Sequence, residues 1–124
     1  MLYVVVPSEA PVLKPVTVLN STSVKVEWLP VPEEYRHGII TKYVIFYEAE
    51  KETEKSEEKR ESANNAVING LRQSTTYSFR IWAETVKGPS PKSNPENATT
   101  EGKEFKIIKS LFSYARLVLT GHPI

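Results

Sequence analysis

Cysteine is absent from the 124 residues of this chain, and its absence excludes both a disulfide framework and a thiolate metal site. Histidine occurs only as His37 and His122, so no histidine pair has the spacing that metal binding requires. The sequence also lacks a glycine-rich phosphate loop and a recognisable set of nucleophile, base and orienting group. We therefore expect no enzyme activity, no catalytic residue, no metal and no cofactor.

An excess of one charge sign is also missing, since 16 basic and 15 acidic side chains leave a net charge of +1. A general electrostatic attraction to nucleic acid is therefore not supported. The segment between Glu48 and Ser62 is rich in glutamate, but it lacks the Asp/Asn ligands and turn glycine of a calcium loop and contains lysines. We interpret it as a long solvated hairpin or loop, with an exposed helical turn as the alternative.

Long hydrophobic runs are missing as well. The opening MLYVVV has no basic region before it and leads directly into Pro7, so it is too short for a signal peptide or a membrane span. The residues after Gly102 are also too few and too charged to cross a bilayer, and their basic side chains give only a weak signal for a lipid surface. We expect either a cytosolic chain or a part of a larger protein.

The sequence does contain period-two alternation of apolar and polar residues, punctuated by turn residues from Pro11 onward. A chain of this length has room for one core. The alternation predicts an all-β fold whose inward side chains come from three strands and the turn before the third, and a last strand from Lys92 to Thr100 with Pro95 at an edge or bulge. The inward residues are Val24, Val26, Trp28, Tyr43, Ile45, Tyr47, Ile68, Leu71, Tyr77, Phe79, Ile81 and Ala83.

Four segments together resemble the fibronectin type III family: Trp28 followed by LPVP, then GIITKYVIFY, GLRQSTTY and GPSPKSNPENATT. The resemblance covers residues 11–102, and it implies a seven-stranded immunoglobulin-like sandwich with Trp28 as a structural residue. It also implies a tyrosine corner at Leu71 and Tyr77, in which the phenol hydroxyl bonds back to the backbone. Residues 1–10 would then be an N-terminal lead and residues 103–124 a C-terminal tail.

The tail has apolar residues at helical spacing from Phe105 to Leu119, and Gly121 and Pro123 would end such a helix. Three interpretations stay open. The tail is an amphipathic helix, the beginning of another module, or an end that does not fold by itself.

Trp82 is the residue that the alternation places on the unexpected side. If Tyr77, Phe79 and Ile81 point inward, period two forces Trp82 outward, where Phe46 of the neighbouring strand could meet it. The result would be an exposed aromatic patch for a protein partner. Alternatively, the stems of Arg80 and Lys42 or the tail residues Phe105, Ile108 and Phe112 cover it. The candidate partner face comprises Lys42, Val44, Phe46, Arg80 and Trp82.

Two loops that the family topology places at one end of the sandwich form a second candidate surface. Their candidate binding residues are Tyr35, Arg36, His37, Lys87, Gly88, Pro89 and Ser90. The chain has no Arg-Gly-Asp triplet and no Trp-Ser-x-Trp-Ser signature. Possible N-glycosylation sites are Asn20, at a predicted turn, and Asn97, which faces outward if Ala98 and Thr100 face inward. A glycan at Asn97 would compete with a large partner on the sheet face.

The resemblance implies a non-catalytic module for protein–protein contact or adhesion, within a larger receptor, adhesion or receptor-phosphatase ectodomain. We expect a protein partner, no nucleic acid, a monomeric module, and contact with a membrane only through the parent receptor. The module would be extracellular or at the cell surface. The alternatives are a passive structural spacer and a cytosolic scaffold module.

Overall fold

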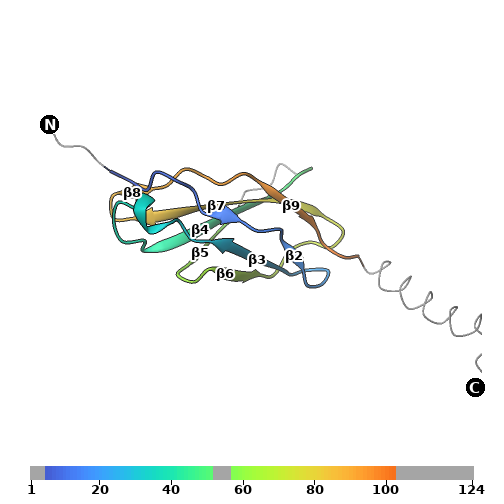
Figure 1. Ribbon diagram of the computed structural model, residues 1–124. Coiled ribbons are helices and arrows are strands. Elements are labelled where there is room, and N and C mark those ends of the chain that lie inside the picture. Colours follow the sequence, from blue (N-terminus) through green and yellow to red (C-terminus); the bar gives the residue numbers. More distant parts are fainter. Residues whose placement is uncertain (1–4, 52–56, 103–124) are drawn as a thin grey trace, which may run out of the picture.

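The computed structural model describes residues 5–51 and 57–102, and in this part of the chain nine short strands form two antiparallel sheets (Figure 1). The predicted all-β sandwich is therefore confirmed. The expectations for the tail, residues 103–124, and for residues 52–56 of the charged segment lie outside the described residues. None of the helices in the described part is long and apolar enough to cross a membrane.

The first sheet is organised around β3, Val24–Leu29. It pairs with β6, Asn65–Ile68, and with two short strands near the N-terminus, β1 (Val12–Leu13) and β2 (Thr17–Val18). Pro15 lies between β1 and β2, and a proline has no N–H to donate to a ladder. This edge of the sheet therefore consists of two short strands.

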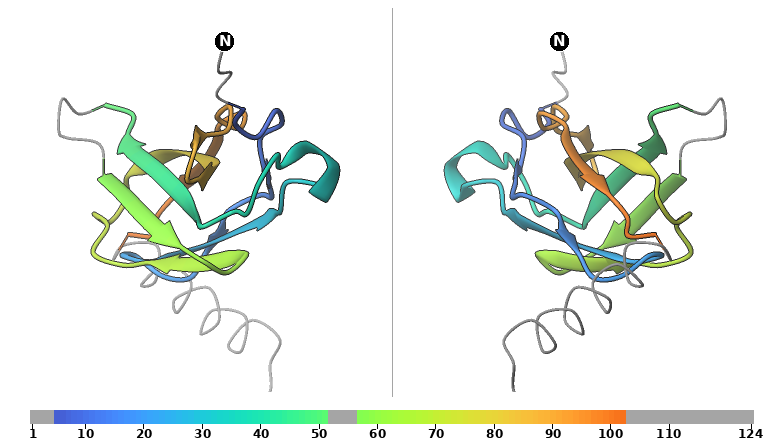
Figure 2. Two further views of the ribbon diagram at one scale, coloured as in Figure 1. Left: turned by 90° about the vertical axis from the view of Figure 1, so that its left-hand side faces the viewer. Right: turned by 90° about the vertical axis from the view of Figure 1, so that its right-hand side faces the viewer.

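The second sheet is organised around β4, Lys42–Ala49, and β7, Thr76–Thr85, which pair along eight positions from Lys42↔Glu84 to Ala49↔Tyr77. The other edge of β4 pairs with β5, Glu57–Glu61. The described ends of the charged segment therefore form a hairpin, as the sequence predicted. Figure 2 looks along the sandwich and shows the two sheets facing each other.

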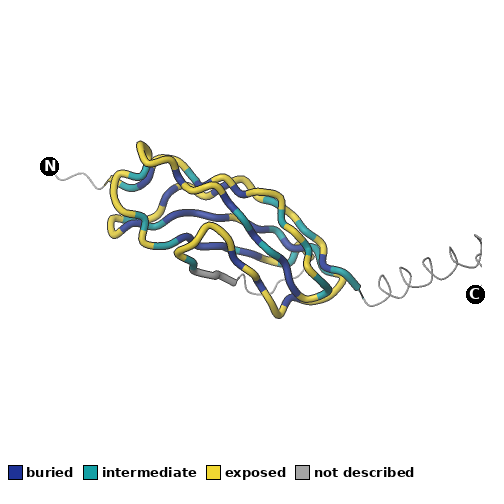
Figure 3. The backbone as a smooth tube through the Cα atoms, turned by 60° about the horizontal axis from the view of Figure 1, so that its bottom comes forward, coloured by how far each residue is buried: buried dark blue, intermediate teal, exposed yellow. Residues whose placement is uncertain are grey.

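A short 3-10 helix, η1 (Glu33–Tyr35), lies in the loop between β3 and β4. The segment before β1 also packs on the domain, because Pro7 is fully buried and the Ser8 N–H donates to the Tyr35 carbonyl at 2.9 Å. Figure 3 shows buried positions along the strands and exposed loops at the ends of the sandwich.

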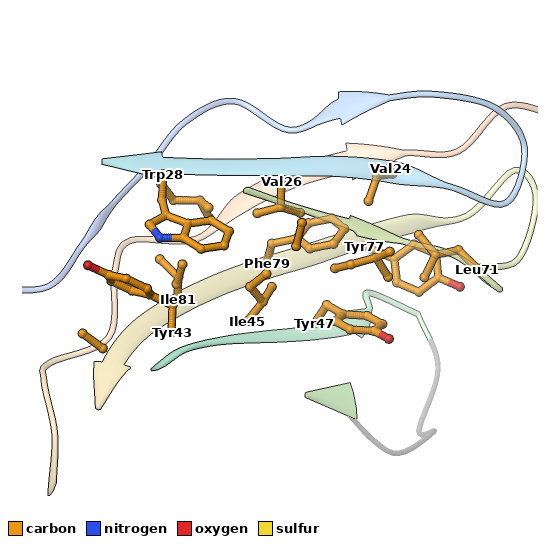
Figure 4. Close-up of a cluster of buried hydrophobic side chains, with 14 of the residues drawn as sticks. Val24, Val26, Trp28, Tyr43, Ile45, Tyr47, Leu71, Tyr77, Phe79 and Ile81 are labelled. Carbon is orange, nitrogen blue, oxygen red and sulfur yellow. The ribbon is translucent and has the colours of Figure 1, made fainter. Parts of the chain in front are cut away.

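The core lies between the sheets and includes all twelve side chains that the alternation predicted to point inward, and Figure 4 shows part of it. Leu13, Val31 and Ala66 also belong to the core and were not predicted. Trp28 is buried and packs against Tyr43, with ring centroids 5.5 Å apart. Tyr47 and Phe79 stack at 6.0 Å across the β4–β7 pair. Such pairs add attraction beyond the area that they bury, so they fix the register between the strands as well as the core.

The tyrosine corner is present. The Tyr77 hydroxyl accepts a hydrogen bond of 2.9 Å from the backbone N–H of Arg72, and Leu71 is buried beside it. The turn in between is closed further by the Ser74 N–H, which donates to the Glu101 carbonyl, and by the Thr75 hydroxyl, which donates to the Gln73 carbonyl.

The predicted last strand, Lys92 to Thr100, is wrong in extent. The structure has β8 at Gly88–Pro89 and β9 at Glu96–Thr99, both paired with β7, and residues 90–95 between them form no strand. Pro91 and Pro95 have no backbone N–H to donate to a neighbouring strand. Ser90 and Ser93 instead hold this segment against β7, with hydrogen bonds that involve their side chains. Each serine donates its N–H to a β7 carbonyl, and its hydroxyl accepts the N–H of the same β7 residue, Ala83 or Ile81.

Candidate functional site

The sheet face formed by β4 and β7 brings together the five residues that the sequence placed there. Val44 lies opposite Trp82, and Phe46 lies opposite Arg80. The rings of Phe46 and Trp82 meet diagonally, with centroids 6.4 Å apart. Neither Val44 nor Trp82 belongs to the core cluster between the sheets. The predicted direction of these side chains is therefore confirmed.

The predicted exposure of Trp82 is wrong, since the side chain is only 8% exposed, and Val44 opposite it is fully buried. Among the described side chains, Lys92 lies over this face, with its Nζ 5.2 Å from the Trp82 ring centroid and 5.5 Å from that of Phe46. Lys92 thus makes cation–π contacts with both rings and covers them.

Arg80 and Lys42 are not the covering cations that one interpretation required. Arg80 is exposed, and Lys42 forms a 3.4 Å ion pair with Glu84. The same Glu84 accepts a hydrogen bond of 3.2 Å from the Trp82 indole Nε1. The polar edge of the indole is therefore satisfied within the sheet, and Trp82 presents little free surface. The alternative that the tail covers this face concerns residues outside the described ones.

The second candidate surface lies at the end of the sandwich where the β3–β4 and β7–β8 loops meet. The Thr41 N–H, just before β4, donates to the carbonyl of Glu84 in β7 at 2.8 Å, so the pairing of the two strands continues to the base of these loops. Beyond it, Ile39 is 84% exposed and Val86 is 88% exposed. We call this end, with Tyr35, Ile39, Val86 and Lys87, the loop pole.

The predicted loop residues divide into exposed ones and structural ones. Tyr35 is 40% exposed, and Lys87 is exposed. Arg36 instead donates from Nε to the Val31 carbonyl at 2.7 Å, and Ser90 is buried against β7. Gly88 has φ +142°, and a Cβ there would meet Val6 at 3.0 Å, so this glycine is needed for close packing.

A shallow apolar depression adjoins the loop pole. His37 lies on its rim and contacts the Ser8 hydroxyl through Nε2 at 3.3 Å. Its other lining residues come from the N-terminal segment and the β8 region: Val5, Val6, Pro7, Ser8, Pro89, Ser90 and Pro91.

Sequence reasoning missed three residues that matter for these surfaces. Val86 is a β-branched apolar residue inside a predicted loop, and that mismatch was a usable signal, whereas Ile39 was assigned to the strand that follows the loop ending near Gly38. Lys92 carried no comparable signal, because its place over two rings depends on how residues 90–95 run along β7. Among the described residues, no group of three or more His, Cys, Asp or Glu side chains could hold a metal ion.

Both possible glycosylation sites lie where the sequence predicted. Asn20 is in the turn between β2 and β3, where its Oδ1 accepts hydrogen bonds from the backbone N–H and the hydroxyl of Thr22 at 2.9 and 3.2 Å. Asn97 is exposed on β9 opposite Ser78, while Thr100 is buried. The outward direction of Asn97 is therefore confirmed.

Comparison with known proteins gives a consistent result. The family model described as the fibronectin type III domain matches residues 10–99. The chain is 38% identical over 106 residues to the netrin receptor DCC of Homo sapiens, covering 79% of this chain and 7% of the receptor. It is also 38% identical over 104 residues to receptor-type tyrosine-protein phosphatase F of Bos taurus, covering 78% of this chain and 5% of that protein.

Solved structures of fibronectin III domains resemble this chain as well. The third fibronectin III domain of the human KIAA0343 protein superposes with a TM-score of 0.70 at 26% identity, covering 83% of this chain and 90% of that one. The FN5 domain of Drosophila Lar gives a TM-score of 0.64 at 27% identity, covering 78% of this chain and 99% of that domain.

Proposed function

We propose, from the premise that this chain belongs to the fibronectin type III family, that it is a non-catalytic protein-interaction module of a larger cell-surface receptor. The matches to receptors and receptor phosphatases support this proposal, and the chain spans less than a tenth of the length of those relatives. The domain would occupy residues 11–102 and act as a monomer, with a protein as its partner.

The observation that carries the proposal is the exposure of Ile39 and Val86 at the loop pole, 84% and 88%. Two large aliphatic side chains held in water at one end of a rigid sandwich cost free energy that burial against a partner would recover, about 1.5–3 kcal/mol for each side chain fully buried. Loops fixed by a scaffold are common recognition sites. The partner would present an apolar surface to this pole.

The sheet face favours a second candidate function, that of a spacer. Lys92 and Glu84 already occupy the faces and the polar edge of the Phe46–Trp82 pair, so this surface is satisfied within the domain. A module that used neither surface would serve only to hold its neighbours apart.

An extracellular location would allow glycosylation at Asn20 and Asn97. At Asn20, both hydrogen bonds from Thr22 go to Oδ1, so they leave the acceptor nitrogen Nδ2 available. Expression through the secretory pathway, followed by enzymatic glycan removal, tests this. A larger mass loss from the wild type than from Asn20→Gln would support glycosylation at Asn20, and equal losses from the two forms, or none from the wild type, would contradict it.

The test of the loop pole compares four forms of the chain as immobilised baits. Netrin, which the name of the DCC receptor gives as that receptor's ligand, is the first defined probe, and labelled cell-surface proteins are the second. The forms are the wild type, the double variant Ile39→Ser/Val86→Ser, the sheet-face variant Arg80→Ala and the control Val12→Ser. Val12 is an exposed apolar residue on β1 in the other sheet.

We expect saturable binding to the wild type, Arg80→Ala and Val12→Ser, and its loss in the loop-pole variant. All four forms should melt at similar temperatures, because each replaced side chain is exposed. Equal capture by all four forms would contradict the loop pole as the binding surface, and absence of saturable capture would favour the spacer.

A further inference from the structure

We propose that Asn69 is a site of spontaneous covalent modification, at which the backbone nitrogen of Gly70 attacks the side-chain amide carbon and the amide nitrogen leaves as ammonia. This inference does not depend on the proposed binding function. Asn69 is exposed in the turn that follows β6, and Gly70 comes next. Cyclisation requires the backbone nitrogen of Gly70 to reach the Cγ of Asn69. The rate of this reaction therefore depends on the residue that follows the asparagine and on how freely the backbone of the turn can move.

The turn leaves this nitrogen open to approach. Gly70 has φ +73°, in the left-handed region, and a Cβ placed there would have no heavy atom within 4 Å. Within the described part of the chain, no hydrogen bond is formed by the Gly70 N–H, whereas the Leu71 N–H donates to the Thr22 carbonyl at 2.9 Å. The space beside the Gly70 Cα is therefore open, and no carbonyl of the described residues holds the Gly70 N–H.

Ser23 adds a feature that the sequence pair Asn-Gly does not contain. Its hydroxyl donates a 2.8 Å hydrogen bond to the Asn69 Oδ1, and Ser23 itself is buried. When a nitrogen attacks Cγ, negative charge develops on Oδ1. A fixed donor aimed at that oxygen stabilises the developing charge, as donors do in oxyanion holes. Ser23 thus acts as a positioning and polarising residue for the Asn69 amide.

The other asparagines lack this combination. Asn94 precedes Pro95, which has no N–H, and Asn65 and Asn97 lie in strands whose backbones are paired. Asn20 and Asn64 precede residues with a Cβ, which hinders attack by the following nitrogen. These five asparagines provide an internal reference for the rate at Asn69.

The reaction balances without an oxidant or a reductant. The Gly70 nitrogen loses its proton to hydroxide or water and forms a bond to Cγ, and the amide nitrogen leaves as ammonia, which gives a five-membered succinimide. Water then opens the ring at one of its two carbonyls. The products are aspartate or isoaspartate at position 69, and the net change is the addition of one water and the loss of one ammonia.

The two products would have different effects on the fold. Aspartate keeps the backbone length, and its carboxylate still accepts from the Ser23 hydroxyl. Isoaspartate adds a carbon to the main chain between two anchored residues: Ile68, which pairs with Val24, and Leu71, which is held by Thr22. The extra atom must displace one anchor, next to the Arg72–Tyr77 bond of the tyrosine corner. Modification therefore adds a negative charge and loosens this turn.

The experiment incubates the purified full chain at neutral and mildly alkaline pH and follows each asparagine-containing peptide by mass spectrometry, with enzymatic methylation to detect isoaspartate. We expect the Asn69 peptide to change from amide to acid severalfold faster than the Asn20 and Asn97 peptides, and faster at higher pH, because the deprotonated nitrogen attacks. Equal rates at Asn69 and Asn97, or no isoaspartate at Asn69, would overturn the proposal.

Matched variants identify the reacting residue and measure the contribution of Ser23. Asn69→Gln should abolish the change at position 69. Ser23→Ala should slow it severalfold, and Ser23→Thr, which keeps a hydroxyl, should restore it. Thermal melting identifies a variant that has merely loosened the turn, since loosening would accelerate the reaction rather than slow it. An unchanged rate in a stably folded Ser23→Ala variant would refute the role of the hydroxyl.

Discussion

Lys92 contacts both rings of the outer aromatic pair, Phe46 and Trp82. Its ammonium lies 5.2 Å from the Trp82 centroid and 5.5 Å from that of Phe46. In the described part of the chain, the aliphatic stem and charge of a single lysine thus accompany two outward-facing aromatic rings.

Replacing Lys92 with methionine keeps most of the stem and removes the charge. We expect the free energy of unfolding to fall by about 0.5–1 kcal/mol, the size of an exposed cation–π contact, and Trp82 to become more accessible to a fluorescence quencher. Urea denaturation and acrylamide quenching measure the two effects. Lys87→Met, in the adjacent exposed loop, is the control, and an equal effect of both changes would contradict the role of Lys92.

Tyr77 offers a second test at this scale. Tyr77→Phe keeps the ring in the core but removes the acceptor for the Arg72 N–H. We expect a loss of about 1–3 kcal/mol of stability, the cost of leaving a partly buried donor without a partner. Urea denaturation measures this loss. Tyr35→Phe, whose ring is 40% exposed, should change stability little. Equal midpoints for wild type and Tyr77→Phe would show that the corner is dispensable.

At the scale of elements, the segment 90–95 lies along β7 without being a strand. Ser90 and Ser93 supply hydroxyl acceptors where a regular strand would supply carbonyls, and the two prolines need no partner for an N–H. The edge of the sheet is therefore closed to further pairing along residues 81–83, because the β7 groups there are already bonded.

Ser93→Ala tests this arrangement. It removes the acceptor of the Ile81 N–H but leaves the backbone bond from Ser93 to the Ile81 carbonyl. We expect about 1–3 kcal/mol of destabilisation and faster hydrogen exchange at the Ile81 amide. Asn94→Ala, at an exposed neighbouring position, should leave that amide unchanged. If the two variants exchange alike at Ile81, the hydroxyl does not protect this edge.

The same elements show which features could be predicted from sequence. Period two correctly gives the directions of Val44, Phe46 and Trp82, because a strand alternates whatever surrounds it. It does not give burial, because burial depends on side chains from elsewhere in the chain that lie on the sheet, and Lys92, ten residues after Trp82, is one that contacts the ring. The sequence indicated only part of the split of the last strand. Pro95 predicted an edge or a bulge, but the role of the Ser90 and Ser93 hydroxyls as acceptors could not be predicted, because it depends on the path of the backbone along β7.

At the scale of the whole molecule, the described N-terminal residues belong to the sandwich. Pro7 is fully buried, and Ser8 is bonded to Tyr35, although the family resemblance began at residue 11. Removal of residues 1–9 should therefore lower stability by about 1–3 kcal/mol through lost apolar burial. Thermal and urea unfolding of this truncation, compared with removal of residues 1–4 alone, measures the contribution of residues 5–9. Identical stability of the two truncations would place the boundary at residue 10 or later.

The first and the last described residues lie at opposite ends of the long axis of the sandwich (Figure 1). A mechanical pull on the two ends would therefore act nearly along the strands and load the hydrogen bonds between them in shear. The edges beside the two ends would carry the force first: the Ser8–Tyr35 bond at the entry, and the bonds that join β9 to β7 at the exit. The edge of β7 that Ser90 and Ser93 close to further pairing therefore also lies next to the strands through which the domain would transmit tension to its neighbours.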